Sequence, residues 1–251
     1  MPRANKNKEA AVGSQNRTVS PNEAKSALTH CIKLQRPIMM WGAPGIGKSD
    51  IVKQIADAEG RQVIDIRLPL WEPTDIKGIP YYNSKENNMV WASPAELPTD
   101  PKSTAIVFLD ELNSAAPAVQ AAAYQLILNR RVGQYHLPEG VSIVAAGNRD
   151  SDKGVTYRMP APLANRFVHI ELRVDFEDWL QWATNEHIHA DVVGYCTFAK
   201  QDLYDFDPRG SSRSFATPRS WSFVSQLLSD DLPESTLTDL VAGCVGEGLA
   251  V

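Results

Sequence analysis

Eight consecutive residues near the N-terminal end of the chain have the types and spacing of a phosphate-binding loop. They follow the pattern G-x-x-x-x-G-K-[ST] and are Gly42, Ala43, Pro44, Gly45, Ile46, Gly47, Lys48 and Ser49. The glycines let successive backbone N–H groups turn inward around an anion, and the N-terminus of a following helix adds partial positive charge. The lysine reaches the β- and γ-phosphates, and the serine hydroxyl binds Mg²⁺. The pattern therefore predicts a nucleoside triphosphate site.

Two acidic residues come directly after an apolar strand predicted over residues 104–109. They are Asp110 and Glu111, and a continuous apolar strand is typical of a parallel sheet that is covered on both faces. Ligands bind at the carboxyl ends of such strands, so both carboxylates are expected beside the phosphate-binding loop. We expect Asp110 to hold Mg²⁺ and Glu111 to orient and polarise an attacking water. Asn148 follows a strand predicted at 142–146 and is placed to sense the γ-phosphate.

The elements around these residues predict an α/β fold. A helix should begin at Ser20, because a serine cap is followed by Pro21 and by Glu23 three residues after the cap. An apolar run leads into the phosphate-binding loop, and apolar residues at helical spacing follow the loop. The predicted strands cover residues 37–41, 62–68, 104–109, 142–146 and 168–172, and a further helix covers 116–128. This order predicts a parallel sheet with helices on both faces.

Two segments should project from this core, and the end of the chain should form a separate helical part. Residues 79–91 are expected to form a hairpin, and residues 132–139 a short turn or hairpin. From residue 174 the pattern becomes helical, with helices predicted over 176–184, 190–203, 219–228 and 236 to the end. The expected organisation is a mobile N-terminal arm (1–19), an α/β nucleotide-binding domain (20–172) and a small α-helical lid (173–251).

Two arginines could face an anion. Arg219 lies in the first turn of a predicted helix, where a cation opposes the helix dipole and therefore suggests an anionic partner; the alternative is an arginine that faces solvent. Arg166 ends a short helix predicted at 160–167. It makes either an ordinary surface or helix-end contact, or it reaches the nucleotide of a neighbouring subunit.

The composition is that of an ordinary globular protein. The chain has 251 residues, of which 43% are hydrophobic and 22% charged, and its net charge of −5 argues against a dominant role in binding nucleic acid. No apolar run has the roughly twenty residues that a membrane span needs, and the N-terminus lacks an apolar signal core. The three scattered cysteines are typical of reduced thiols, so we expect a cytoplasmic protein without a membrane partner.

The motifs taken together resemble the MoxR-type branch of the AAA+ ATPases, within the dynein-related AAA subfamily. The likeness runs from about residue 20 to the C-terminus. The segments that carry it are GAPGIGKS at 42–49, DIKGIP at 75–80, the stretch 91–98, FLDELN at 108–113, AAGNR at 145–149, LANRF at 163–167 and TPRSW at 217–221.

This resemblance implies a role for each matched residue. It assigns Lys48 and Ser49 to the Walker A element, and Asp110 and Glu111 to Walker B, with ATP and Mg²⁺ as cofactors. It makes Asn148 the first sensor. It also makes Arg166 an arginine finger that acts in a neighbouring subunit, and Arg219 the second sensor in the lid. Arg130 or Arg131 is a further arginine facing that neighbour, and the two projecting hairpins line a pore or face a client.

The implied function is Mg-dependent ATP hydrolysis by a ring, a hexamer, that remodels, activates or assembles a protein client. The resemblance further implies a partner with a von Willebrand factor A domain. Two alternatives stay open. A DNA-associated AAA+ motor or loader is opposed by the acidic balance of the chain. A monomeric nucleotide switch would need the pattern N-K-x-D after a strand, where this chain has Asn148-Arg149-Asp150.

Overall fold

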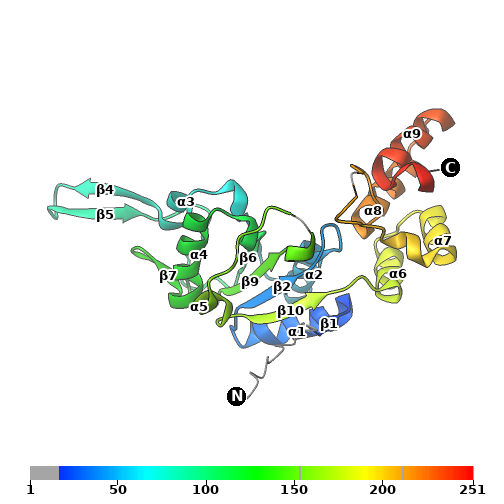
Figure 1. Ribbon diagram of the computed structural model, residues 1–251. Helices are drawn as coiled ribbons and strands as arrows, with labels where there is room; N and C mark the ends of the chain where they lie inside the picture. Colours follow the sequence, from blue (N-terminus) through cyan, green and yellow to red (C-terminus); the bar gives the residue numbers. More distant parts are fainter. Residues whose placement is uncertain (1–16, 153, 211, 251) are drawn as a thin grey trace, which may run out of the picture.

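A six-stranded parallel sheet forms the centre of the molecule. The computed structural model describes residues 17–152, 154–210 and 212–250, and the strand order is β1-β10-β2-β9-β6-β3 (Figure 1). The strands are β1 (Thr18–Val19), β2 (Ile38–Trp41), β3 (Val63–Arg67), β6 (Ile106–Asp110), β9 (Ser142–Gly147) and β10 (Val168–Leu172). Every neighbouring pair is parallel. The carboxyl ends of β2, β6 and β9 therefore meet at one edge, as the sequence predicts.

Helices cover both faces of this sheet. Helices α1 (Pro21–Lys33) and α2 (Lys48–Glu59) pack on one face, and α4 (Pro117–Asn129) and the short α5 (Ala161–Ala164) pack on the other. Because both faces are covered, the side chains of β9 are buried throughout, and so are those of β6 up to Asp110. The predicted P-loop α/β core is confirmed.

Helix α1 begins where the sequence predicts. The Ser20 backbone N–H donates to the Glu23 carboxylate at 2.8 Å, and the Ser20 hydroxyl accepts from the Glu23 N–H, which closes a capping box. Ala24, Leu28 and Ile32 are buried on one side of the helix, against the sheet. The capping pattern and the apolar spacing are both local signals, which is why the sequence contains enough information to place this helix.

Two hairpins leave the core on the side away from the C-terminus. Strands β4 (Ile79–Asn83) and β5 (Asn88–Ala92) pair antiparallel and project as a long arm beyond the short helix α3 (Pro73–Lys77) (Figure 1). A smaller hairpin follows α4 and consists of β7 (Arg131–Val132) and β8 (Tyr135–His136). The backbone N–H of Trp91 in β5 donates to the Gln134 side chain at 3.2 Å, so the turn of the smaller hairpin touches the base of the longer one. Both hairpins are confirmed.

The C-terminal helices form a separate cluster at the other end of the molecule (Figure 1). They are α6 (Phe176–Asn185), α7 (Ala190–Phe198), α8 (Pro218–Leu228) and α9 (Glu234–Val245), and they enclose a hydrophobic core around Trp179 and Trp221. Asp178 in α6 ties this cluster to α1, because its carboxylate accepts from the Ser20 hydroxyl at 2.6 Å and from the Asn22 backbone N–H at 2.8 Å.

Four sequence predictions need correction. Residues 18–19, assigned to the mobile arm, pair with β10 as an edge strand; residues 1–16 of that arm lie outside the described part of the chain. The helix predicted at 190–203 is interrupted, because Ala199 leaves helical geometry and a separate 3₁₀ turn follows. The helix predicted at 160–167 is reduced to the four residues of α5. The last helix begins at Glu234 and ends at Val245 instead of continuing to the C-terminus.

None of the described helices has the length and apolar character needed to span a membrane. Cys31, Cys196 and Cys244 are all free thiols. Burial raises the pKa of the Cys196 thiol to about 12, so this side chain is an inert part of the C-terminal core.

Candidate active site

The loop between β2 and α2 has the conformation that a phosphate cradle requires. Gly45 and Gly47 adopt positive φ angles of 75° and 91°, which glycine tolerates and which turn the backbone N–H groups inward. Gly42 serves another purpose: a Cβ atom there would lie 2.5 Å from Cδ1 of Ile46. Helix α2 begins at Lys48, so its N-terminus opens onto the same space.

The Lys48 side chain folds back over this loop. Its Nζ donates to the Gly42 and Ala43 carbonyls at 2.7 and 2.9 Å, and to Asn148 Oδ1 at 3.2 Å. Burial lowers the pKa of Lys48 from 10.5 to about 8, although the nearby Asp110 carboxylate acts in the opposite direction. A buried ammonium without a full counter-charge favours an added anion, so the lysine suits a phosphate.

The acidic pair lies opposite the first turn of α2. Asp110 ends β6, and its Oδ2 is 3.5 Å from the Ser49 hydroxyl. A hydroxyl and a carboxylate at this separation are hard oxygen ligands of the kind that Mg²⁺ selects. Glu111 is exposed and has a positive φ of 55°, a conformation that is uncommon outside glycine and is concentrated at functional sites. Its side chain is available to a solvent molecule.

Asn148 reaches the same edge from β9, as the sequence predicts. A second asparagine, which the sequence analysis did not single out, holds it there: Asn113 Nδ2 donates to the Asn148 carbonyl at 2.8 Å. Asn113 is 2% exposed, and a Cβ atom on Gly147 would lie only 2.3 Å from its Oδ1. In the sequence Asn113 ends the segment FLDELN, three residues after Asp110, and neither feature distinguishes a support from a turn residue.

Arg149 anchors the segment that follows Asn148. Its guanidinium binds Asp152 at 2.9 Å and Glu171 of β10 at 3.2 Å. The hydrogen bond that Arg149 donates to Asp152 is the main cause that raises the pKa of Arg149. These contacts keep Asn148 beside Lys48, and the one with Glu171 joins positions too far apart in the sequence for a spacing rule to predict.

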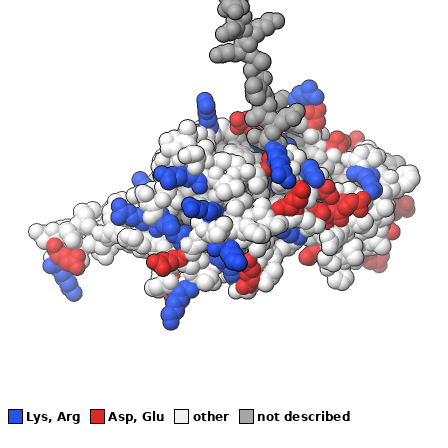
Figure 2. All heavy atoms as spheres, turned by 90° about the horizontal axis from the view of Figure 1, so that it is seen from below, with Lys and Arg blue, Asp and Glu red and all other residues white. Residues whose placement is uncertain are grey.

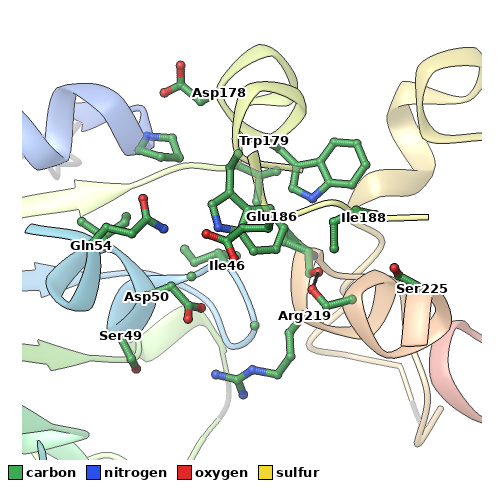
Figure 3. A pocket seen from close by; sticks show the side chains of 18 of the residues that line it. Ile46, Ser49, Asp50, Gln54, Asp178, Trp179, Glu186, Ile188, Arg219 and Ser225 are labelled. Carbon is green, nitrogen blue, oxygen red and sulfur yellow. Dashed lines mark hydrogen bonds between the residues drawn. The ribbon is translucent and has the colours of Figure 1, made fainter. Parts of the chain in front are cut away.

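The C-terminal helices close the site from the other side. The Arg219 backbone N–H donates to the Gly45 carbonyl at 3.2 Å, and a Cβ atom on Gly45 would lie 2.7 Å from the Thr217 hydroxyl. Thr217 caps α8 through the Ser220 N–H at 3.1 Å, so this helix start rests directly on the phosphate loop. Figure 3 shows the Arg219 side chain reaching from α8 toward Ser49.

A cavity of about 670 Å³ lies between the phosphate loop, the start of α2 and the C-terminal helices. Its walls include Ile46 and Gln54 on one side and Trp179, Trp182 and Ile188 on the other, and Figure 3 shows Trp179 and Ile188 opposite Ile46. A cavity of this size with apolar walls and a few polar groups suits a small-molecule ligand such as a nucleotide.

One predicted site residue is not brought to this edge. Arg166 lies just before β10, and Val168 of β10 pairs with Ile38 at the start of β2. The whole length of β2, at about 3.3 Å per residue, therefore separates Arg166 from the phosphate loop. Its side chain is exposed and forms no hydrogen bond or ion pair with another described residue. Figure 1 shows α5 on the side of the sheet that faces away from the C-terminal helices.

The two arginines after α4 have different surroundings. Arg130 Nη2 donates to the carbonyls of Pro138 and Val141 at 2.7 and 2.8 Å, which fixes the segment after β8. Burial lowers the pKa of Arg130. Arg131 is exposed. Arg130 is therefore committed within its own chain, and of this pair only Arg131 faces outward.

The fold and the site together define a P-loop ATPase of the AAA+ class. Residues 37–169 match the family described as "ATPase family associated with various cellular activities (AAA)". The match covers more than half of the chain, and the chain belongs to this family. ATP hydrolysis with Mg²⁺ is the activity of the family, and its members typically assemble into rings.

Part of the chain is also similar in sequence to two curated proteins. The protein called midasin from Giardia intestinalis is 29% identical over 175 residues, which cover 64% of this chain and 4% of that protein. Midasin from Dictyostelium discoideum is 26% identical over 167 residues, which cover 60% of this chain and 3% of that protein. The chain thus corresponds to a small fraction of these curated relatives.

Solved structures agree on the fold. A putative ATPase from Cytophaga hutchinsonii superposes with a TM-score of 0.51 at 22% identity, covering 69% of this chain and 52% of that one. The Thermotoga maritima RuvB Holliday junction branch migration motor superposes with a TM-score of 0.50 at 16% identity, covering 92% of this chain and 66% of that one. These likenesses concern architecture alone.

The residues of the site fit ATP with Mg²⁺. The phosphate loop supplies inward N–H groups and the Lys48 ammonium, and the pair formed by Ser49 and Asp110 supplies oxygen ligands of the kind Mg²⁺ prefers. The cavity beside the loop has room for a base and a sugar. The cavity, the phosphate loop and the pair of metal ligands follow one another as the base and sugar, the phosphates and the metal ion do in ATP with Mg²⁺.

Proposed function

We propose that this chain hydrolyses ATP in a ring of identical subunits, with a catalytic pocket completed by each neighbour. The α/β domain (20–172) binds the nucleotide, and the C-terminal helices (173–251) act as its lid. The observation that carries the proposal is the position of Arg166, which is exposed at the edge opposite its own Lys48. A subunit cannot use this arginine itself, but it can present it to a neighbour.

The chemistry follows from the side chains of two subunits. Bound ATP and Mg²⁺ supply the γ-phosphoryl group and neutralise part of its charge. Lys48 holds the phosphates, Ser49 and Asp110 hold the metal, and Glu111 orients the attacking water. Asn148, fixed by its contact with Lys48, positions that water. Arg219 from the lid and Arg166 from the neighbour stabilise the transition-state charge, and an arginine supplied by a neighbour is worth about 10³–10⁵ in rate.

The charge distribution supports a head-to-tail ring. Residues 173–251 contain 13 acidic and 5 basic residues, net −8, whereas residues 20–172 contain 16 acidic and 16 basic residues, net 0. On the face shown in Figure 2, basic side chains lie mainly over the α/β domain and acidic side chains gather toward the lid. The acidic lid of one subunit can pair with these basic side chains on the next, and such a heterologous contact closes into a ring when the rotation allows it.

We further propose that the ring, of the MoxR type and a hexamer, remodels or activates a protein client. The hairpin β4–β5 supports this idea, because it projects from the core with apolar side chains in the open: Ile79 is 65% exposed, Tyr82 60% and Met89 56%. Apolar residues on a projecting arm indicate contact with another protein. A partner with a von Willebrand factor A domain and a cytoplasmic location are parts of this proposal, and the free cysteines support that location.

The test of the proposal is the dependence of specific ATPase activity on protein concentration. We expect activity per subunit to rise steeply across the range in which sedimentation shows assembly. Arg166→Ala should lower kcat by about 10³–10⁵ with the Kd for ATP unchanged. The control is Arg209→Ala, because Arg209 is an exposed arginine in the lid that pairs with Asp207 at 3.5 Å. Flat specific activity, together with full activity of Arg166→Ala, would refute the proposal.

A further inference from the structure

A tryptophan and a histidine connect the strand that enters the phosphate loop to the turn that carries Arg166. Trp41 is the last residue of β2 and directly precedes Gly42. Its indole Nε1 donates to His169 Nδ1 at 2.9 Å, and the two rings stack with centroids 6.0 Å apart and planes 14° apart. The other imidazole nitrogen, Nε2, lies 2.7 Å from the Ala164 carbonyl.

These contacts fix the tautomer of the neutral imidazole. Nδ1 accepts from the indole, so in the neutral ring the proton is on Nε2, which donates to Ala164. Ala164 is the last residue of α5, and the carbonyl groups at the end of a helix lack partners within the helix. The Ala164 carbonyl also accepts the Phe167 backbone N–H at 3.2 Å, so His169 adds a second bond to this carbonyl and connects α5 to β10.

Arg166 lies between two residues that His169 contacts. Ala164, two positions before it, accepts the Nε2 bond, and Phe167, one position after it, meets the imidazole edge-on at 6.1 Å. The Arg166 backbone is fixed further by its N–H bond to the Leu163 carbonyl at 3.0 Å. These local bonds shape the turn, and the contacts with His169 fix its position against β10.

The Trp41–His169 pair also extends along the strands, from their carboxyl ends toward their amino ends. Trp41 stands at the phosphate edge of β2, and Ala164 and Arg166 stand near the opposite edge, before β10. Trp41 packs against the same hydrophobic cluster as Leu163 and Phe167. A chain of contacts thus runs from Trp41, beside the phosphate loop, through His169 to the residues on either side of Arg166.

We propose that His169, held by Trp41, is a positioning residue that directs Arg166 toward the neighbouring subunit and links it to the phosphate loop of its own subunit. The inference rests on the proposed function, because positioning matters only if Arg166 acts in a neighbour.

A mixing experiment separates the two subunits of a shared pocket. Glu111→Gln subunits cannot hydrolyse ATP but present Arg166, and Arg166→Ala subunits hydrolyse ATP only beside a neighbour that presents an arginine. Each alone should be nearly inactive, and an equimolar mixture of the full-length chains should recover activity. His169→Phe, which keeps an aromatic ring and removes both hydrogen bonds, is then introduced either into the Glu111→Gln donor or into the Arg166→Ala acceptor.

The expected result is asymmetric. His169→Phe in the donor should lower the recovered kcat by at least about tenfold, because a misplacement of about 1 Å can cost up to 10²-fold in rate. The same substitution in the acceptor should leave the recovered rate unchanged. Trp41→Phe in the donor, which removes the indole N–H and one of the two fused rings, should act in the same direction and provides a second variant if His169→Phe does not fold. His30→Phe is the control, because His30 is exposed and bonds only the Ser26 carbonyl of its own helix.

Two outcomes would overturn the inference. One is a full rate with both His169→Phe and Trp41→Phe in the donor. The other is an equal loss with the substitution in donor and acceptor, since a general structural role would affect both. An inactive mixture of the two unmodified parents is a different failure: it would refute the ring proposal itself, and this inference with it. Sedimentation of each mixture shows whether the variants still assemble.

Discussion

The phosphate edge of the sheet, at the carboxyl ends of the strands, and the opposite edge, at their amino ends, differ in how much of a binding site one chain provides. At the phosphate edge, Lys48 makes three hydrogen bonds, and Asn148 is held by Asn113. At the opposite edge, Arg166 is exposed and bonds no described residue through its side chain. The first edge is built for a ligand, and the second presents a cation outward. This difference indicates that one subunit contains most of a catalytic pocket and offers the missing part to another.

The largest expected effect at the phosphate edge comes from Glu111→Gln. The substitution removes the carboxylate that orients water but keeps the size of the side chain, so kcat should fall by about 10²–10⁴. The Kd for ATP, measured by calorimetry, should not change, because Lys48 and the loop stay intact. Asp65→Asn is a suitable control, because Asp65 lies in β3, one strand away from the strand that Glu111 follows. Burial raises the pKa of the Asp65 carboxyl. Unchanged hydrolysis in Glu111→Gln would remove Glu111 from the pocket.

A second variant tests whether Asn148 belongs to the pocket. Asn148→Ala removes the amide that contacts Lys48, and kcat should fall by about 10²-fold, as for the loss of one aligned polar group in an active site. Asn113→Ala should act in the same direction but more weakly, because it removes only the support of Asn148. Steady-state rates at saturating ATP measure both effects. A larger loss in Asn113→Ala than in Asn148→Ala would contradict this order.

A third test concerns the metal, and here the substitution should have a smaller effect than the two above. Chelation of Mg²⁺ by EDTA should abolish hydrolysis, and Ser49→Ala should raise the Mg²⁺ concentration needed for half-maximal rate by at least about tenfold, because it removes one ligand of the ion. Saturating Mg²⁺ should restore part of the rate. The matched control is Ser222→Ala: Ser222 also lines the cavity, but its hydroxyl bonds the Pro218 carbonyl of its own helix. Equal Mg²⁺ requirements for Ser49→Ala and the parent would contradict the metal assignment.

The smallest expected effect concerns ring assembly. Because the lid carries net −8 and is proposed to contact basic side chains on the α/β domain of the next subunit, salt should weaken the contact between subunits. Raising the ionic strength from about 0.05 to about 0.5 M shortens the Debye length to a few ångström, so the assembly midpoint seen by sedimentation should move to higher protein concentration. A midpoint that does not move with salt would remove the electrostatic part of the comparison while leaving the role of Arg166 intact.

The sequence was sufficient to predict the phosphate edge because its signals are local. The glycine pattern at 42–49, the apolar strand before Asp110 and the capping residues at Ser20 and Glu23 each specify geometry within a few positions. The sheet, the helices on its faces and the two hairpins were therefore predicted correctly. The length of α5 was not, since the segment tightens after Ala164 into turns in which the Arg166 and Phe167 N–H groups bond the Leu163 and Ala164 carbonyls, and no residue type in the sequence marks that change.

The supports of the site could not be predicted because they join distant segments. Asn113 reaches Asn148, Arg149 reaches Glu171, and Trp41 reaches His169 over separations that no spacing rule covers. The same reason explains why the edge strand Thr18–Val19 was assigned to a mobile arm: its pairing partner, β10, lies far along the chain. The roles of Arg166 and Arg219 stay predictions, since they concern a bound nucleotide and a second subunit.

The most direct test of the shared pocket is an electron cryo-microscopy structure of the Glu111→Gln protein with Mg²⁺ and ATP. The account predicts a closed ring in which the Arg166 guanidinium of each subunit lies within hydrogen-bonding distance of the γ-phosphate held by Lys48 of its neighbour. A nucleotide-bound structure in which Arg166 lies away from every subunit boundary would contradict it.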